Sequence, residues 1–247
     1  DVYKRQLPSC ATARCSALSR RQLPYLSPTL TPFANRVSAG RCVVSEARRS
    51  VTCMATITTE VATNTRWDDV QHALTGGGDG ASCQCIWPML SNKEWNETTT
   101  PQRVEMLRDE IETGPPPGLI AYVDGDAAGW IRIGPRAKQQ RVPRTRMIAT
   151  ASAEPFDDES VWAVTCFVVR REHRGSGLNL ELLRAAVDFA RSSGARLIEG
   201  YPVDTRGEKK RTNDLFHGML TTFLAAGFEE KAELKPGRTL VALELSG

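Results

Sequence analysis

The sequence has 247 residues, of which 40% are hydrophobic and 25% charged, a composition typical of one globular domain or at most two small ones. Its formal net charge of +3 is uneven, because residues 1–53 carry a balance of +7 and residues 54–247 one of −4. The mildly acidic main part argues against a nucleic-acid-binding surface. The longest nearly apolar run, Val161–Val169, is far shorter than the ~20 residues that cross a membrane.

The head segment, residues 1–53, is rich in Arg, Ser, Thr and Ala and has no amphipathic periodicity. This composition is typical of an organellar transit peptide, and Arg48–Ala55 resembles a plastid processing site. An alternative is a non-native leader read through into a start at Met54. We expect a plastid or mitochondrial protein in the first case and a cytoplasmic one in the second. A polar lead-in over residues 54–65 then precedes the main domain at residues 66–247.

Three cysteines belong to the main domain, and four others lie in the head segment. An odd set, Cys83, Cys85 and Cys166, cannot form a closed disulfide framework, which favours a reducing compartment. The close pair Cys83 and Cys85 invites a metal interpretation, but the three histidines supply no second ligand pair for a four-ligand zinc site. We expect no metal, and small buried apolar side chains at these positions.

A Gly-rich run and an amphipathic helix open the main domain. Residues 75–81, Thr-Gly-Gly-Gly-Asp-Gly-Ala, predict a loop, since the Lys-Ser/Thr of a phosphate-binding loop does not follow them. The next helix is predicted to begin with Thr100 as its N-cap and Pro101 as its first residue, and to end at Gly114.

A β-hairpin and a basic connection follow this helix. The apolar runs Gly118–Val123 and Ala127–Ile133 flank Asp124-Gly125-Asp126, whose Gly and Asp tolerate the positive φ of a hairpin turn. Residues 134–160 contain five Arg or Lys and are long for a connection. We expect those charges to form a solvated surface.

The second half of the domain alternates strands and helices. Val161–Val169 is predicted to be a strand buried on both faces, and an amphipathic helix, Gly177–Ser193, comes shortly after it. The hydrophobic pattern then predicts a strand at 195–201, a helix at 214–226 and strands at 230–234 and 239–245. This order indicates a mixed α/β fold.

The turn between the buried strand and its helix carries the main chemical signal. Unpaired backbone N–H groups and the helix dipole favour an anion at such a helix start. Gly175 and Gly177 remove side chains that would hold a diphosphate at a distance. The pattern excludes the dinucleotide and triphosphate glycine motifs. By itself it is also compatible with an ordinary tight turn.

Here the sequence resembles the GNAT N-acetyltransferases, whose signature is Gln/Arg-x-x-Gly-x-Gly/Ala. Arg174 and Gly177 match it, whereas Asn179 stands where Gly or Ala is usual. A second block, FHGMLTTFLAAGF, is similar to a later family helix that ends in Gly-Phe, here Gly227 and Phe228. The resemblance implies an acyl-CoA N-acyltransferase fold: a mixed central sheet, splayed between its fourth and fifth strands and flanked by helices.

The resemblance also implies direct acetyl transfer from acetyl-CoA to an amine of a small molecule or peptide, by a monomer or homodimer that binds neither nucleic acid nor membrane. The pantetheine would lie between the fourth and fifth strands and pair with nearby backbone amides. The cofactor-binding residues implied are Phe167, Val168, Val169, Arg174, Gly175, Ser176, Gly177, Leu178 and Asn179.

The catalytic groups are less well marked. Glu199 is the first candidate for the general base, because it interrupts an apolar strand beside the expected cleft, and Asp157, Asp158 and Glu159 are alternatives. Phe223 stands where the family often has a Tyr that protonates the leaving thiolate, so water, Tyr201 or His217 must substitute. Otherwise the domain is a noncatalytic acyl-CoA-binding sensor or assembly module. A covalent acyl relay through Cys166 is less favoured than a core position.

Overall fold

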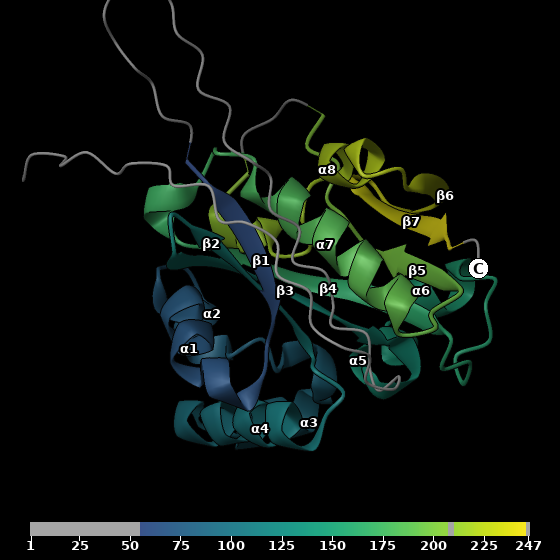
Figure 1. The fold of residues 1–247 in the computed structure, drawn as a ribbon. Helices are drawn as coiled ribbons and strands as arrows, with labels where there is room; N and C mark the ends of the chain where they lie inside the picture. The colour runs from purple at the N-terminus through teal and green to yellow at the C-terminus, as the bar shows by residue number, and fades with distance from the viewer. Residues whose placement is uncertain (1–54, 207–209, 246–247) are drawn as a thin grey trace, which may run out of the picture. The chain divides into compact units, whose positions relative to one another are not determined.

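A mixed β-sheet forms the centre of the fold in a computed structural model that describes residues 55–206 and 210–245 (Figure 1). Within these residues seven strands pair in the order β1-β2-β3-β4-β5-β7-β6, and β4–β5 is the parallel pair among otherwise antiparallel neighbours. Their bounds are Ile57–Val61, Gly118–Val123, Asp126–Pro135, Val161–Val169, Leu197–Gly200, Glu229–Lys235 and Arg238–Glu244 for β1 to β7. The predicted mixed α/β fold is confirmed.

Helices cover both faces of the sheet (Figure 1). Their bounds are Trp67–Thr75, Gly80–Cys83, Asn92–Glu97, Thr100–Thr113, Arg141–Arg144, Arg146–Ala151, Leu178–Ser192 and Leu220–Ala225 for α1 to α8. Short 3-10 helices lie at Asn64–Arg66, Trp87–Met89, Arg136–Lys138, Arg171–His173 and Thr212–Leu215. Among the described residues no helix is long and apolar enough to span a bilayer.

The hydrophobic core is divided between the two faces. Successive strand residues point to opposite sides, so Leu119 and Ile131 pack on the side of α7, whereas Ile120 and Trp130 pack on the side of α1 and α4. The apolar face of α7 supplies the largest contribution to the first cluster. The sheet is thus held rigidly between two packed layers, and β4 lies at its centre.

Two local signals give the expected structures. Asp124 and Gly125 have φ of 51° and 90°, and the hairpin between β2 and β3 is confirmed. Helix α4 begins one residue earlier than predicted, because Thr99 is its N-cap. Gln102 accepts from the Thr99 amide at 2.8 Å and completes a capping box.

The parallel pair separates halfway along β4. Val161–Val164 pair with Leu197–Gly200, but β5 ends at Gly200 while β4 continues to Val169. The predicted splay between the fourth and fifth strands is therefore present. It leaves one edge of the C-terminal half of β4 without a strand neighbour in the described chain.

The predicted helix at 214–226 is interrupted. A 3-10 helix ends at Leu215, and α8 begins only at Leu220. Gly218 lies between them with φ of 82°, and a Cβ there would lie 2.8 Å from the ring of Phe167. Close packing against β4, which hydrophobic periodicity does not register, breaks the helix at this glycine.

Two other segments differ from expectation. The polar stretch at residues 54–65 contributes the edge strand β1, which pairs with β2. The basic stretch 134–160 folds into short helices, and its Arg136 is fully buried. The transit-peptide prediction and the head cysteines lie outside the described residues.

Candidate functional site

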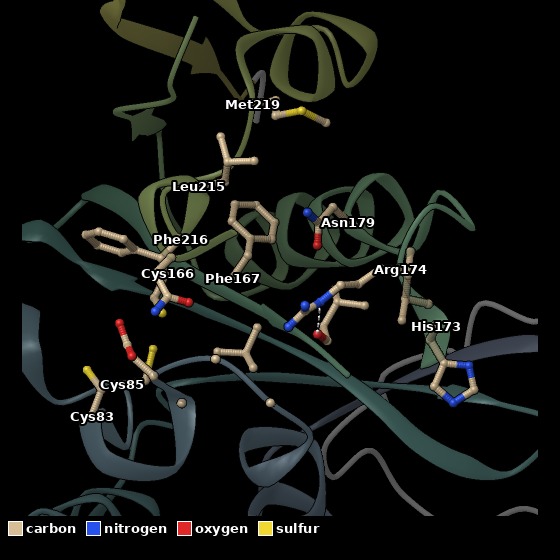
Figure 2. A pocket seen from close by; sticks show the side chains of 18 of the residues that line it. Cys83, Cys85, Cys166, Phe167, His173, Arg174, Asn179, Leu215, Phe216 and Met219 are labelled. Carbon is tan, nitrogen blue, oxygen red and sulfur yellow. Dashed lines mark hydrogen bonds between the residues drawn. The ribbon is translucent and has the colours of Figure 1, made fainter. Parts of the chain in front are cut away.

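A cavity with a volume of about 790 Å³ lies where β4 leaves β5 (Figure 2). Its walls come from the end of β4, the turn before α7, the segment from Gly77 to Pro88 and the segment from Asn213 to Thr222. A volume of this order suits a small molecule or cofactor. Eight of the nine predicted cofactor-binding residues line it: Phe167, Val168, Val169, Arg174, Gly175, Gly177, Leu178 and Asn179.

The turn before α7 is shaped for an anion. Gly177 is the N-cap of this 15-residue helix with φ of 82°, and Gly175 has φ of 80°. The first amides of α7 have no carbonyl of a preceding helical turn to donate to, and the helix dipole adds partial positive charge there. Arg174 Nε donates to the Val169 carbonyl at 3.1 Å, which ties the turn to the end of β4 (Figure 2).

Ser176 and Asn179 have different positions at this turn. The Ser176 hydroxyl donates to the His173 carbonyl at 2.6 Å, and Ser176 is absent from the cavity lining. Asn179 lies on the cavity wall, and its buried Oδ1 has no hydrogen-bond partner among the described residues (Figure 2). A buried carbonyl oxygen without a partner is costly, so a donor on a bound molecule would relieve that cost.

The exposed-amide prediction for β4 needs correction. The Phe167 N–H already donates to the Phe216 carbonyl at 2.6 Å. Amides alternate between the two edges of a strand, so the Val168 amide points to the opposite edge from that of Phe167, toward β3, as the Arg170 amide does when it donates to the Ala128 carbonyl. Val169 lies two residues after Phe167, so its amide points to the same, splayed edge of β4.

Three thiols gather at one end of the cavity (Figure 2). Burial raises the pKa of Cys83 to about 11, and a hydrogen bond to Cys85 together with burial holds the pKa of Cys166 well above its usual value. Both groups are therefore thiols at neutral pH. Cys85 and Cys166 are buried as expected, whereas Cys83 is partly exposed. The described residues contain no group of potential ligands that could hold a metal ion.

Glu199 does not lie beside an open cleft, contrary to expectation. It is 2% exposed and is not part of the cavity lining. Its Oε2 pairs with Arg136 at 2.9 Å and its Oε1 accepts from the Ser152 hydroxyl at 2.6 Å. The Tyr201 hydroxyl also donates to Oε2, at 2.9 Å. These contacts give the carboxylate a structural role, and its role as a base stays a prediction.

The other predicted proton-transfer groups also lie outside the cavity lining, and of these Asp157 and Glu159 are exposed. Burial and the neighbouring Glu199 hold the pKa of Tyr201 well above its usual value. Asp158 accepts from Ser160 and Arg196, and these bonds lower its pKa to about 2. Phe223 is fully buried and packs edge-on against Phe167 and so offers no proton.

The opposite wall of the cavity does not follow from the sequence. Gly77 and Gly78 lie across from the turn, and a Cβ on either would be 3.7 Å from an Arg174 nitrogen. The Gly-rich run signals a loop, but only the fold brings it to the turn. Phe216 likewise reaches β4 through the break at Gly218, which the helix pattern conceals.

A mixed sheet that splays after one parallel pair, with a glycine turn and helix start at the opening, defines the acyltransferase class of α/β domains. Residues 87–203 match the model of the acetyltransferase (GNAT) family. The resemblance found in the sequence is thereby confirmed. No curated protein matches the chain.

Solved structures with a similar fold include the GNAT domain of S. lividans PAT, at 17% identity, with 77% of this chain and 91% of that chain covered and a TM-score of 0.44. The Salmonella typhimurium protein yncA, solved with its cofactor acetyl-CoA, has 17% identity, coverage of 77% and 94%, and a TM-score of 0.44. Aminoglycoside acetyltransferase AAC(6')-Ib, in complex with coenzyme A, has 14% identity, coverage of 76% and 94%, and a TM-score of 0.45.

Proposed function

We propose that this domain is an acetyl-CoA-dependent N-acetyltransferase that moves the acetyl group directly from the CoA thioester to an amine. One observation carries the proposal: a single cavity joins the anion-binding turn before α7 to the splayed edge of β4. The family model over residues 87–203 supports the same reaction class.

The residues present fit acetyl-CoA as a co-substrate. The amides at Leu178 and Asn179 and the nearby Arg174 would bind the diphosphate, where charge-assisted hydrogen bonds contribute about 1.5–3 kcal/mol each. The apolar wall formed by Phe167 and Val168 suits the pantetheine arm. The Val169 amide is the group available for strand-like pairing with that arm.

In the reaction the amine nitrogen attacks the thioester carbonyl carbon. A C–N bond forms, the C–S bond breaks, and the amine proton leaves to solvent or a base while the CoA thiolate takes up a proton. An amine with pKa near 10 is about one part in a thousand neutral at pH 7, so placement and deprotonation both matter. Water fits the proton-transfer role, because none of the predicted proton-transfer residues lines this cavity.

A noncatalytic acyl-CoA-binding module is the competing function. Two observations favour it: Phe223 cannot donate a proton, and the Phe216 carbonyl occupies an amide of the splayed edge. A ligand that needs the Phe167 amide would have to displace Phe216.

Calorimetric titration with CoA and acetyl-CoA, followed by transfer of radiolabelled acetyl to a panel of amines, tests the proposal. We expect binding of both and transfer to at least one amine. Binding without transfer to any amine would favour the noncatalytic module. Failure to bind either compound would reject both functions.

A further inference from the structure

A second, smaller cavity of about 180 Å³ lies beside the large one. Both cavities share Trp87 and Pro88 as a wall. Adjacent residues of the chain also face the two spaces: Thr165 lines the small cavity and Cys166 the large one. Likewise, His217 lines the small cavity and its neighbour Phe216 lines the large one. A molecule in the small cavity would therefore lie next to the splayed part of β4.

The small cavity is lined by cations without carboxylates. Arg141, Lys235 and Arg238 contribute to its wall, and no Asp or Glu does. The guanidinium groups buried elsewhere in the described chain have acidic partners: Arg132 pairs with Glu110 and Arg136 with Glu199. No carboxylate pairs with Arg141 or Arg238 in the described residues, although burial lowers the pKa of both. Arg141 and Arg238 are partly buried and Lys235 is exposed. A partly buried cation without a counter-ion favours the binding of an anion beside it.

Both guanidinium groups are held in fixed orientations. Arg141 stacks on the Trp87 ring at 3.4 Å and donates through Nε to the Trp87 carbonyl at 2.8 Å, whereas its buried Nη2 has no hydrogen-bond partner among the described residues. Arg238 donates through Nη1 to the Tyr201 carbonyl at 2.9 Å. Planar guanidinium groups held in this way are suited to bind a carboxylate.

His217 supplies a neutral hydrogen-bond acceptor, in contrast to the cationic donors Arg141 and Arg238. Burial and the charge of Arg238 lower its pKa to about 3, against the effect of a hydrogen bond to the Thr165 backbone, so the imidazole is neutral at pH 7. Its buried Nδ1 has no partner among the described residues. A neutral imidazole nitrogen without a proton accepts a hydrogen bond from an N–H group, so His217 adds a hydrogen-bond acceptor to the residues that line the cavity.

We propose that the small cavity binds the acceptor of the acetyl group, and that this acceptor is a small amine that carries a carboxylate. Arg141 and Arg238 bind the carboxylate, and His217 Nδ1 accepts from the amine and directs it toward the large cavity. The inference rests on the proposed acetyltransferase function and adds the substrate class to it. The volume of about 180 Å³ restricts the bound part to a few non-hydrogen atoms.

The test compares β-alanine, 4-aminobutyrate and 5-aminovalerate, each beside its primary amide, as acceptors for the full chain with saturating acetyl-CoA. We expect at least a tenfold higher kcat/KM for one or more carboxylates than for the matched amide. Arg238→Gln and Arg141→Gln should each lower the ratio of kcat/KM for the carboxylate to kcat/KM for its amide at least tenfold. Neither should change the Kd for CoA. Arg238→Lys should restore part of the preference for the carboxylate, because the charge is kept.

Arg146→Gln is the matched control, because Arg146 is an exposed arginine of the same segment and does not line the cavity. It should leave the preference unchanged, and thermal melts of all variants establish that they fold. Equal use of the amides and carboxylates, or Arg238 and Arg141 variants that behave like Arg146→Gln, would overturn the substrate class while the transfer function stands. Transfer to no amine with CoA bound would overturn the transfer function itself and this inference with it.

Discussion

Arg136 and Glu199 form a buried ion pair, with 2.9 Å between Nη1 and Oε2, that joins the segment after β3 to strand β5. The second nitrogen, Nη2, donates to the carbonyls of Glu154 and Pro155, and the guanidinium lies over the Phe156 ring. The pair therefore fixes the long connection between β3 and β4 against strand β5. That connection carries Arg141, so the pair also supports the smaller cavity.

Glu199→Gln should lower the free energy of unfolding by about 3 kcal/mol, because it leaves the Arg136 charge buried without its counter-ion. Glu112→Gln on the exposed face of α4 is the control and should cost less than about 0.5 kcal/mol. Urea unfolding of both variants measures the difference. A Glu199→Gln protein as stable as the parent, but with kcat reduced a hundredfold or more, would instead restore Glu199 as the general base.

The stability of the domain should fall as the pH drops below 6.5, because of His217. Its pKa is lowered from 6.5 to about 3 on folding, so the unfolded chain binds more protons between these values and stability rises with pH there. The loss at pH 5.5 relative to pH 7.5 is about 1.4 kcal/mol for one such group.

Urea unfolding of the parent and of His217→Gln at pH 7.5 and pH 5.5 isolates this contribution. Asp158, whose pKa is lowered to about 2, loses its own contribution only at pH values below that window. The parent should lose about 1.4 kcal/mol more than the variant between the two pH values. Equal losses in the two proteins would show that the imidazole is not held neutral by the fold.

The parts of the fold that follow from the sequence rest on local signals. The turn residues Asp124 and Gly125 predict the hairpin, and the buried run Val161–Val169 followed by a glycine turn and an amphipathic helix predicts the centre of the site. Each signal lies within a few residues of the structure it specifies. Eight predicted residues therefore converge on one cavity.

The parts that do not follow depend on pairs distant in the chain. Arg136 and Glu199 are 63 positions apart, and nothing near Arg136 distinguishes it from the exposed arginines of the same segment. Glu199 is a charged residue inside an apolar strand, which indicates a function or a buried partner. The sequence cannot distinguish a general base from the partner of a buried ion pair. The break at Gly218 likewise depends on the ring of Phe167.

Residues 54–247 should fold and bind CoA without the head segment. The core clusters of the described chain draw on residues from Ala62 to Leu245, so the domain has its own hydrophobic core. A cooperative melt of this fragment, with a midpoint raised by saturating CoA, is the expected result. An unfolded fragment beside a folded full-length chain would show that the domain boundary is wrong.

Gly177→Val should weaken CoA binding by about 2 kcal/mol, close to thirtyfold, because the side chain blocks the approach of the diphosphate to the first amides of α7. Gly194→Val is a matched control, since Gly194 has φ of 83° against 82° at Gly177 and a Cβ at either position meets no atom within 4 Å. Both variants place a β-branched side chain at a positive φ, at opposite ends of α7.

Arg174→Ala should weaken CoA binding less than Gly177→Val does, because the backbone amides stay in place. Calorimetric titration with CoA, with circular dichroism to establish folding, decides the matter: a folded Gly177→Val protein that binds CoA as tightly as Gly194→Val would remove the turn from the cofactor site.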